Sequence, residues 1–135
     1  MTVQYSVAVR NAQLDAFETT IGTSAILKIR SGATPDACAT ADSGTVLATL
    51  NLPSDWMDAA SGGSKTFLGV WQDVSADVTG TAGHFRIYAS DGVTCHMQGS
   101  ITLAGGGGDM ILGDTTVVSG TPVIITGFVI TAGNA

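Results

Sequence analysis

Turn signals centred on glycine divide most of this sequence into short stretches, and this pattern constrains the fold more than any other feature. Beyond residue 60 the signals recur at short intervals as SGGS, TGTAG, SDG, AGGGGD and SGTP. The stretches between them are rich in Thr, Val and Ile, which favour strands. Short strands with regular turns and no intervening helices favour an antiparallel sandwich or barrel over an alternating β–α architecture.

Alternation of apolar and polar side chains identifies the individual strands. The stretch AILKIRSG at 25–32 alternates Ile or Leu with Lys and Arg at its centre, as a half-buried strand requires. The stretch TVLATLNLP at 45–53 repeats the pattern. Further strands are predicted at 67–73, 84–89, 94–103, 110–112, 115–118 and 122–131. We therefore predict a mainly β protein, an antiparallel β-sandwich of jelly-roll type with about eight strands.

One amphipathic helix is predicted ahead of the strands, over residues 6–22. It places Leu14, Phe17 and Ile21 at helical spacing and ends at Gly22. The helix could pack across the open face of the sheet or reach toward a neighbouring subunit, and we expect the first because these apolar side chains need cover. A chain of 135 residues has room for one domain, so 1–135 is predicted as a single domain with the β-sandwich over 25–135.

Charged side chains are sparse. They make up 12% of the residues, whereas 44% are hydrophobic and the mean hydropathy is +0.35. A surface so poor in charge suits contact with other protein chains. The net charge of -6 opposes nucleic-acid binding, because the basic residues are scattered along the chain: Arg10, Lys28, Arg30, Lys65 and Arg86. No stretch has the length and apolarity of a membrane helix, and no signal peptide is recognisable, so we predict synthesis in the cytoplasm and no membrane partner.

The run LAGGGGDM at 103–110 raises the question of a phosphate-binding loop. Phosphate loops combine glycine with a following helix N-terminus and a basic residue. Here no Lys or Arg is nearby, Asp109 would repel an anion, and the next residues indicate a strand. The run is therefore predicted to be a flexible reversal between strands.

Other chemistry-bearing residues form no recognisable site. Adjacent strand residues point to opposite faces, so Cys95 and His96 cannot pair as nucleophile and base, although His84 could approach either one. Glu18 is the sole glutamate and lies on the predicted helix. Two aspartate pairs supply too few ligands for a calcium site and are assigned to solvated turns: Asp73 with Asp77, and Asp109 with Asp114. We predict no catalytic residue, no metal site, no cofactor and no enzymatic activity.

The two cysteines, Cys38 and Cys95, lie far apart in the sequence and outside any CxxC pattern. This spacing does not supply the paired cysteine ligands of a structural zinc site. Without an export signal, two free thiols are favoured over a disulfide, which the sequence leaves open.

Two apolar stretches are candidates for contact with a partner. The strand at 123–131 carries apolar residues on both alternating sets, so it is either central or paired with another subunit. Trp56 and Met57 lie between strands, where a plug beneath the sheet is favoured over projection to a partner. The candidate interface residues are Trp56, Met57, Val123, Ile125, Phe128 and Ile130.

Motifs spread over nearly the whole chain carry one family resemblance. They are VRNAQLDAFETTIG, LKIRSGATPDAC, LATLNLPSDWM, GTAGHFRIYASDGVTCHMQGSI, GGGGDMILGDT and ITGFVITAGN. As a set they resemble small β-rich virion structural proteins of tailed bacteriophages. The resemblance implies a subunit present in many copies on a particle, made in the host cytoplasm and located in the virion. It carries no catalytic role.

Within that family we expect a capsid decoration or cement protein, whose partners are the major capsid protein and copies of itself. Repeated protein contacts would stabilise the particle, with no role for nucleic acid. One alternative is a neck, tail tube or fibre-associated protein. Another is a receptor-binding or glycan-binding β-sandwich module, for which Trp71 is the candidate sugar platform.

Overall fold

The computed structural model describes residues 3–133, and in this range it shows one helix and nine strands. The prediction of a mainly β chain with one N-terminal helix is confirmed. The elements are α1 Val7–Ile21, β1 Ile26–Ser31, β2 Val46–Asn51, β3 Ser64–Thr66, β4 Gln72–Asp73, β5 Gly80–Tyr88, β6 Cys95–Thr102, β7 Met110–Leu112, β8 Thr116–Val117 and β9 Val123–Thr131.

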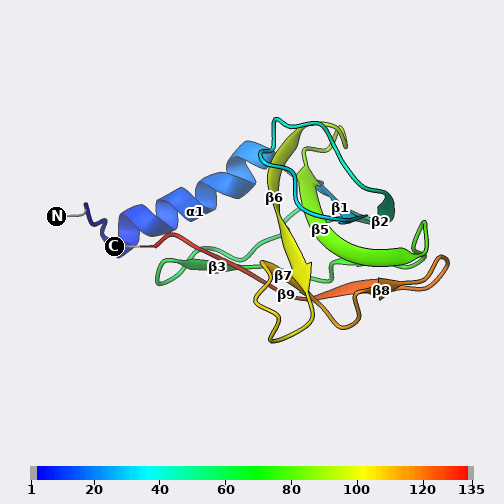
Figure 1. The fold of residues 1–135 in the computed structure, drawn as a ribbon. Coiled ribbons are helices and arrows are strands. Elements are labelled where there is room, and N and C mark those ends of the chain that lie inside the picture. Colours follow the sequence, from blue (N-terminus) through cyan, green and yellow to red (C-terminus); the bar gives the residue numbers. More distant parts are fainter. Residues whose placement is uncertain (1–2, 134–135) are drawn as a thin grey trace.

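The strands form one curled, mixed sheet (Figure 1). Its order is β2-β1-β5-β6-β7-β9-β3, with β4 beside β9 and β8 beside β5. Strands β6 and β7 run parallel, and the other pairs are antiparallel. The predicted antiparallel sandwich is therefore right in its β content and wrong in its arrangement, because a single sheet curls over its own core.

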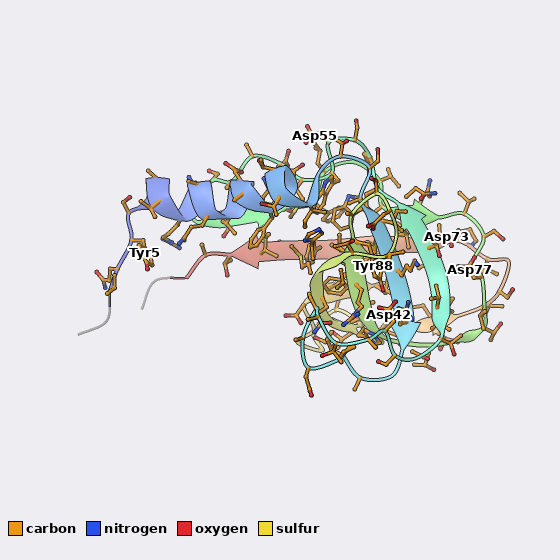
Figure 2. All side chains as sticks on the ribbon, turned by 90° about the horizontal axis from the view of Figure 1, so that it is seen from above. Tyr5, Asp42, Asp55, Asp73, Asp77 and Tyr88 are labelled. Atoms are coloured by element: carbon orange, nitrogen blue, oxygen red, sulfur yellow. The ribbon has the colours of Figure 1, made fainter. Side chains whose placement is uncertain are left out.

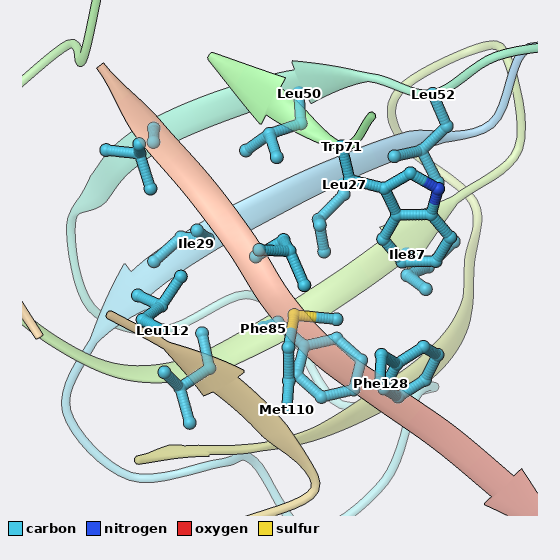
Figure 3. Packing of buried hydrophobic residues seen from close by; sticks show 14 of the residues in the cluster. Leu27, Ile29, Leu50, Leu52, Trp71, Phe85, Ile87, Met110, Leu112 and Phe128 are labelled. Carbon is cyan, nitrogen blue, oxygen red and sulfur yellow. The ribbon is translucent and has the colours of Figure 1, made fainter. Parts of the chain in front are cut away.

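The core fills the inside of this curl. Leu27 and Ile29 of β1 are completely buried, while Lys28 between them lies on the opposite face. They face buried side chains of β7 and β9 across the curl, among them Leu112 and Phe128 (Figure 3). Full burial of one such aliphatic side chain contributes about 1.5–3 kcal/mol relative to its exposure.

An aromatic cluster closes one end of the core. The Trp71 ring lies 5.9 Å from Trp56, 5.5 Å from Phe67 and 5.7 Å from Phe128. The Trp71 indole N–H donates to the carbonyls of Trp56 and Leu68, both at 3.2 Å. The predicted strand at 67–73 is therefore interrupted: residues 67–71 form this plug, and regular pairing is confined to β3 and β4 on either side.

The outer edge of β2 is covered by its own chain. The backbone N–H of Thr49 donates to Asp73 at 2.9 Å, and the Thr49 hydroxyl donates to Asp77 at 2.9 Å. The N–H groups of Asp77 and Val78 both donate to the carbonyl of Leu47. These two aspartates were predicted to be solvated turn residues, but they cap a sheet edge that would otherwise be open to pairing with another chain.

Candidate interaction surface

The six predicted contact residues turn out to belong to the core. Five are at most 7% exposed, and Ile130 packs against the same cluster: Trp56, Met57, Val123, Ile125, Phe128 and Ile130. Four of the six residues belong to β9, and their side chains point into the core. Side chains on the opposite face of β9, such as Ile124 and Val129, point outward and are 48% and 56% exposed. In this chain the six side chains are therefore part of the core rather than of an exposed surface.

An arm extends from the curled sheet, made of α1, β3 and residues 128–131 of β9. Figures 1 and 2 show the helix running alongside this part of β9, away from the curl. Strand β3 joins the arm by pairing Ser64 with Thr131 and Thr66 with Val129. The expected packing of the helix across the open face of the sheet is wrong, since it packs on this extension instead.

The helix has defined ends and a narrow buried face. The Ser6 hydroxyl accepts from the Val9 N–H at 3.3 Å, and Gly22 ends the helix with a φ of 90°. Leu14 and Ile21 are its buried residues, whereas Phe17 is 39% exposed. Apolar packing alone thus gives this helix little attachment.

Lys65 of β3 supplies the attachment through charge. Its ammonium lies 2.8 Å from Asp15, 2.9 Å from Glu18 and 2.7 Å from the carbonyl of Asp58, and its side chain is 2% exposed. Burial works against the charged ammonium, but the hydrogen bonds to Asp15 and Glu18 outweigh it and raise the pKa of Lys65. The hydrogen bonds from Lys65 and from the Ala60 N–H lower the pKa of Asp15.

The far end of the arm is tied by two further contacts. Arg10 donates to the carbonyl of Ala132 at 2.6 Å, and Asn11 accepts from the N–H of Gly63 at 2.9 Å. Gly63 has a φ of 78°, and a Cβ there would collide with the Arg10 guanidinium. The helix is therefore held along its length in one position relative to β3 and β9.

Two hollows flank the helix. One, of about 350 Å³, is lined by Phe17, Met97, Asp109 and residues 128–131 of β9. The other, of about 540 Å³, lies between the helix and residues 54–59, and two of its carboxylates, those of Asp15 and Glu18, are the partners of Lys65. The first hollow brings exposed apolar atoms of the helix and β9 together, and we call Phe17 and Val129, which both line it, the arm patch.

The face of the sheet opposite the core carries an ionic cluster in which the two arginines are buried and the carboxylate is partly exposed. Asp42, from the connection between β1 and β2, accepts from Arg30 at 2.8 Å, Arg86 at 2.6 Å and the Tyr88 hydroxyl at 2.8 Å. Burial favours protonation of Asp42, but the hydrogen bonds from Tyr88 and Arg86 and the charges of both arginines lower its pKa. This Asp42 cluster fixes the 32–45 segment over the sheet.

The glycine run is a compact connection between β6 and β7. The Gly108 N–H donates to Thr102 at 2.9 Å, and the Gly106 N–H donates to the carbonyl of Leu103 at 2.9 Å. A Cβ on either glycine would lie 2.7 Å from the Thr102 hydroxyl. Parallel neighbours usually need about a dozen connecting residues or more, so glycine is what allows 103–109 to suffice. The predicted reversal between strands is wrong, because β7 leaves this connection parallel to β6. The N–H groups of Gly106 and Gly108 already have partners within the chain.

Residues considered for other chemistry lie apart from one another. Trp71 is completely buried, so it cannot present a ring to a sugar. His84 is also buried, with Nδ1 3.0 Å from the carbonyl of Gly32, whereas His96 is exposed. Asp109 accepts from the backbone N–H and the hydroxyl of Ser100, both at 2.9 Å. Among residues 3–133, no three His, Cys, Asp or Glu side chains are grouped as metal ligands.

Within the described part of the chain, no helix has the length and apolarity needed to cross a membrane. Comparison of the chain with known protein families, curated proteins and solved structures found no match.

Proposed function

We propose that this chain is a structural protein of a tailed-bacteriophage virion, a decoration or cement protein that reinforces the capsid through repeated protein contacts and catalyses no reaction. The observation that carries the proposal is the arm patch, two neighbouring apolar side chains exposed beside a hollow on a projecting element. The resemblance of the sequence motifs to virion structural proteins of tailed bacteriophages supports a location in the virion. The major capsid protein and further copies of this chain are the proposed partners.

The exposure of the arm patch is large for side chains of its kind. Phe17 and Val129 are 39% and 56% exposed. Apolar surface transferred from water to a protein contact contributes about 25 cal/mol per Å². One such contact is modest, but symmetric copies multiply it, because neighbouring contacts hold a subunit in place while one opens.

The arm is held in one position, which favours binding of its apolar side chains to a partner over their collapse onto the rest of the chain. Lys65, Arg10 and Asn11 hold the helix against β3 and the end of β9 before any partner is present. A preformed contact element loses less conformational entropy on association than a mobile one. The sparse charge of the chain, 12% of residues, lowers the cost of stripping water from the surfaces that meet.

The location and copy number of the chain on particles test the proposal. We expect quantitative mass spectrometry of purified virions to give hundreds of copies per particle, and immunogold labelling to mark the capsid. A few or a few dozen copies confined to the neck or tail would replace decoration by a tail-associated role. Absence of the chain from purified particles would overturn the virion assignment.

Substitutions in the arm patch test the proposed contact surface. We expect the Phe17→Lys and Val129→Lys double variant to bind capsids lacking the chain at least about tenfold more weakly, because two ammonium groups would have to be desolvated at the contact. Binding is measured by cosedimentation with such capsids. The matched control is Val93→Lys, at a valine that is 78% exposed in the turn between β5 and β6. Equal binding of the double variant and the control would show that partners contact another surface.

A further inference from the structure

The 32–45 segment is held over strand β6 at points on either side of Cys38. The Gln98 side chain donates to the carbonyl of Pro35 at 2.6 Å. Arg86 donates to the carbonyls of Ala37 and Thr40 at 2.9 and 3.0 Å. Since Gln98 and Arg86 are directly paired on β6 and β5, both anchors come from one spot on the sheet, and the backbone around Cys38 is fixed above it.

A β-bulge turns Cys95 toward this segment. Ile87 of β5 pairs with Met97, but the next residue, Tyr88, pairs with Cys95, which leaves His96 as the extra residue. Residues paired across two strands share a face of the sheet, so Cys95 lies on the face of Tyr88 and Arg86. In a regular ladder Cys95 would point to the opposite face, where the core lies.

The two thiols lie near one another on that face, because Arg86 and Gln98 hold the backbone on either side of Cys38 and the bulge turns Cys95 to the same side. Both cysteines are half-buried, and both are free. Burial and a hydrogen bond between the Cys95 and Cys38 side chains raise the pKa of Cys95 to about 11. Cys38 and Cys95 were expected to be two free thiols and both are free, but the fold places them near one another from positions far apart in the sequence.

We propose that Cys38 and Cys95 are a redox site at which an intramolecular disulfide forms when the folded chain meets a low-molecular-weight disulfide such as oxidised glutathione. The Cys38 thiolate attacks one sulfur of oxidised glutathione, forming a mixed disulfide and releasing one glutathione thiolate. Cys95 then loses its proton to solvent and attacks the Cys38 sulfur of that mixed disulfide, which releases the second glutathione. The protein thiols give up two electrons and two protons, and one oxidised glutathione becomes two reduced molecules.

A disulfide between Cys38 and Cys95 would add a covalent link between β6 and the 32–45 segment, which is now held by hydrogen bonds. It would close a loop of roughly 60 residues in the unfolded chain and so reduce the conformational entropy gained on unfolding. We expect the melting temperature to rise by about 10 °C on oxidation and to return to its starting value with dithiothreitol. This inference does not depend on the proposed virion role, since it concerns the isolated chain.

The test compares thiol content, mass and rate in the folded and the unfolded protein. After incubation of the folded chain with oxidised glutathione, thiol titration in denaturant should fall from two groups to none, with an intact mass about 2 Da below that of the reduced chain. The bridge should form at least about tenfold faster in native buffer than in urea, because the fold holds the two sulfurs together. Cys38→Ser and Cys95→Ser should each give only a monomer with one glutathione adduct and no rise in melting temperature.

Two outcomes would overturn the inference. One is stable glutathione adducts or intermolecular dimers of the wild-type chain without an internal bridge. The other is equal rates of bridge formation in native buffer and in urea, which would mean that the fold does not position the pair. The Cys38→Ser and Cys95→Ser double variant reports whether the reduced fold itself tolerates loss of the thiols.

Discussion

Replacement of Arg86 by methionine is expected to lower the free energy of unfolding by about 3 kcal/mol and the melting temperature by about 10 °C. The Arg86 side chain is 2% exposed and donates to Asp42, to Gln98 and to the carbonyls of Ala37 and Thr40. Methionine fills most of the same space but leaves these acceptors without their donor. Chemical denaturation followed by circular dichroism measures the loss.

Two variants bracket this expectation. Arg86→Lys keeps the positive charge but lacks the planar fork that reaches several acceptors at once, so it should fall between wild type and Arg86→Met. Asp36→Asn changes an exposed carboxylate in the same segment and should alter stability by less than about 0.5 kcal/mol. A loss below about 1 kcal/mol for Arg86→Met would contradict the role given to the Asp42 cluster.

The Asp42 cluster also makes the free energy of unfolding depend on pH. Because the pKa of Asp42 is lowered in the folded state, its stabilising contribution is present above the ordinary value of 3.8 and is lost as pH falls through the folded value. Arg86→Met removes one of the groups that lowers this pKa. The variant should therefore lose less of its remaining stability than wild type does between about pH 5 and pH 2.

Replacement of Lys65 by methionine is expected to release the arm helix while the curled sheet stays folded. The change removes the cation shared by Asp15 and Glu18 and should cost about 2 kcal/mol, less than the loss of a fully buried ion pair, because half of the Asp15 side chain is exposed to water. Hydrogen exchange should become roughly 30-fold faster in α1 and β3, whereas amides of β1 and β5 should keep their protection.

Lys28 provides the matched control, because it is the only other lysine of the chain. It makes one hydrogen bond, to the carbonyl of Gly92 at 3.0 Å, and lies 4.9 Å above the Tyr88 ring. Lys28→Met should cost less than about 1 kcal/mol and leave exchange in α1 unchanged. Equal exchange in α1 for the Lys65→Met and Lys28→Met variants would show that apolar packing alone secures the helix.

Local patterns in the sequence predicted most of the secondary structure. The spacing of Leu14 and Ile21 and the stop at Gly22 located the helix, and the alternation around Leu27 located β1. The stretch 67–73 misled the prediction, since its aromatic residues are as typical of a strand as of the plug they form. Its backbone pairs with Trp56 and Phe128, which no local pattern in the sequence can specify.

The candidate surface was harder to predict than the fold. In β9 both alternating sets are apolar, so periodicity could not tell the buried Ile125 from the exposed Val129. Arg86 and Lys65 looked like scattered surface charges because their acidic partners lie far away in the sequence. One feature of the sequence did indicate the role of Arg86. It alternates with the apolar Phe85 and Ile87, so it lies on the outer face of a central strand, and it can be buried there only if another segment covers that face.

The pairing of β1 with β5 has a consequence for how quickly the chain folds. Ile26 meets Tyr88, and β2, β3 and β4 all lie between these two partners in the sequence. The ends of a long loop must therefore come together before the central ladder can form, which favours folding over milliseconds to seconds rather than microseconds. During that interval newly synthesised copies would expose unpaired strands to one another, and a high rate of synthesis would make aggregation the main competitor of folding.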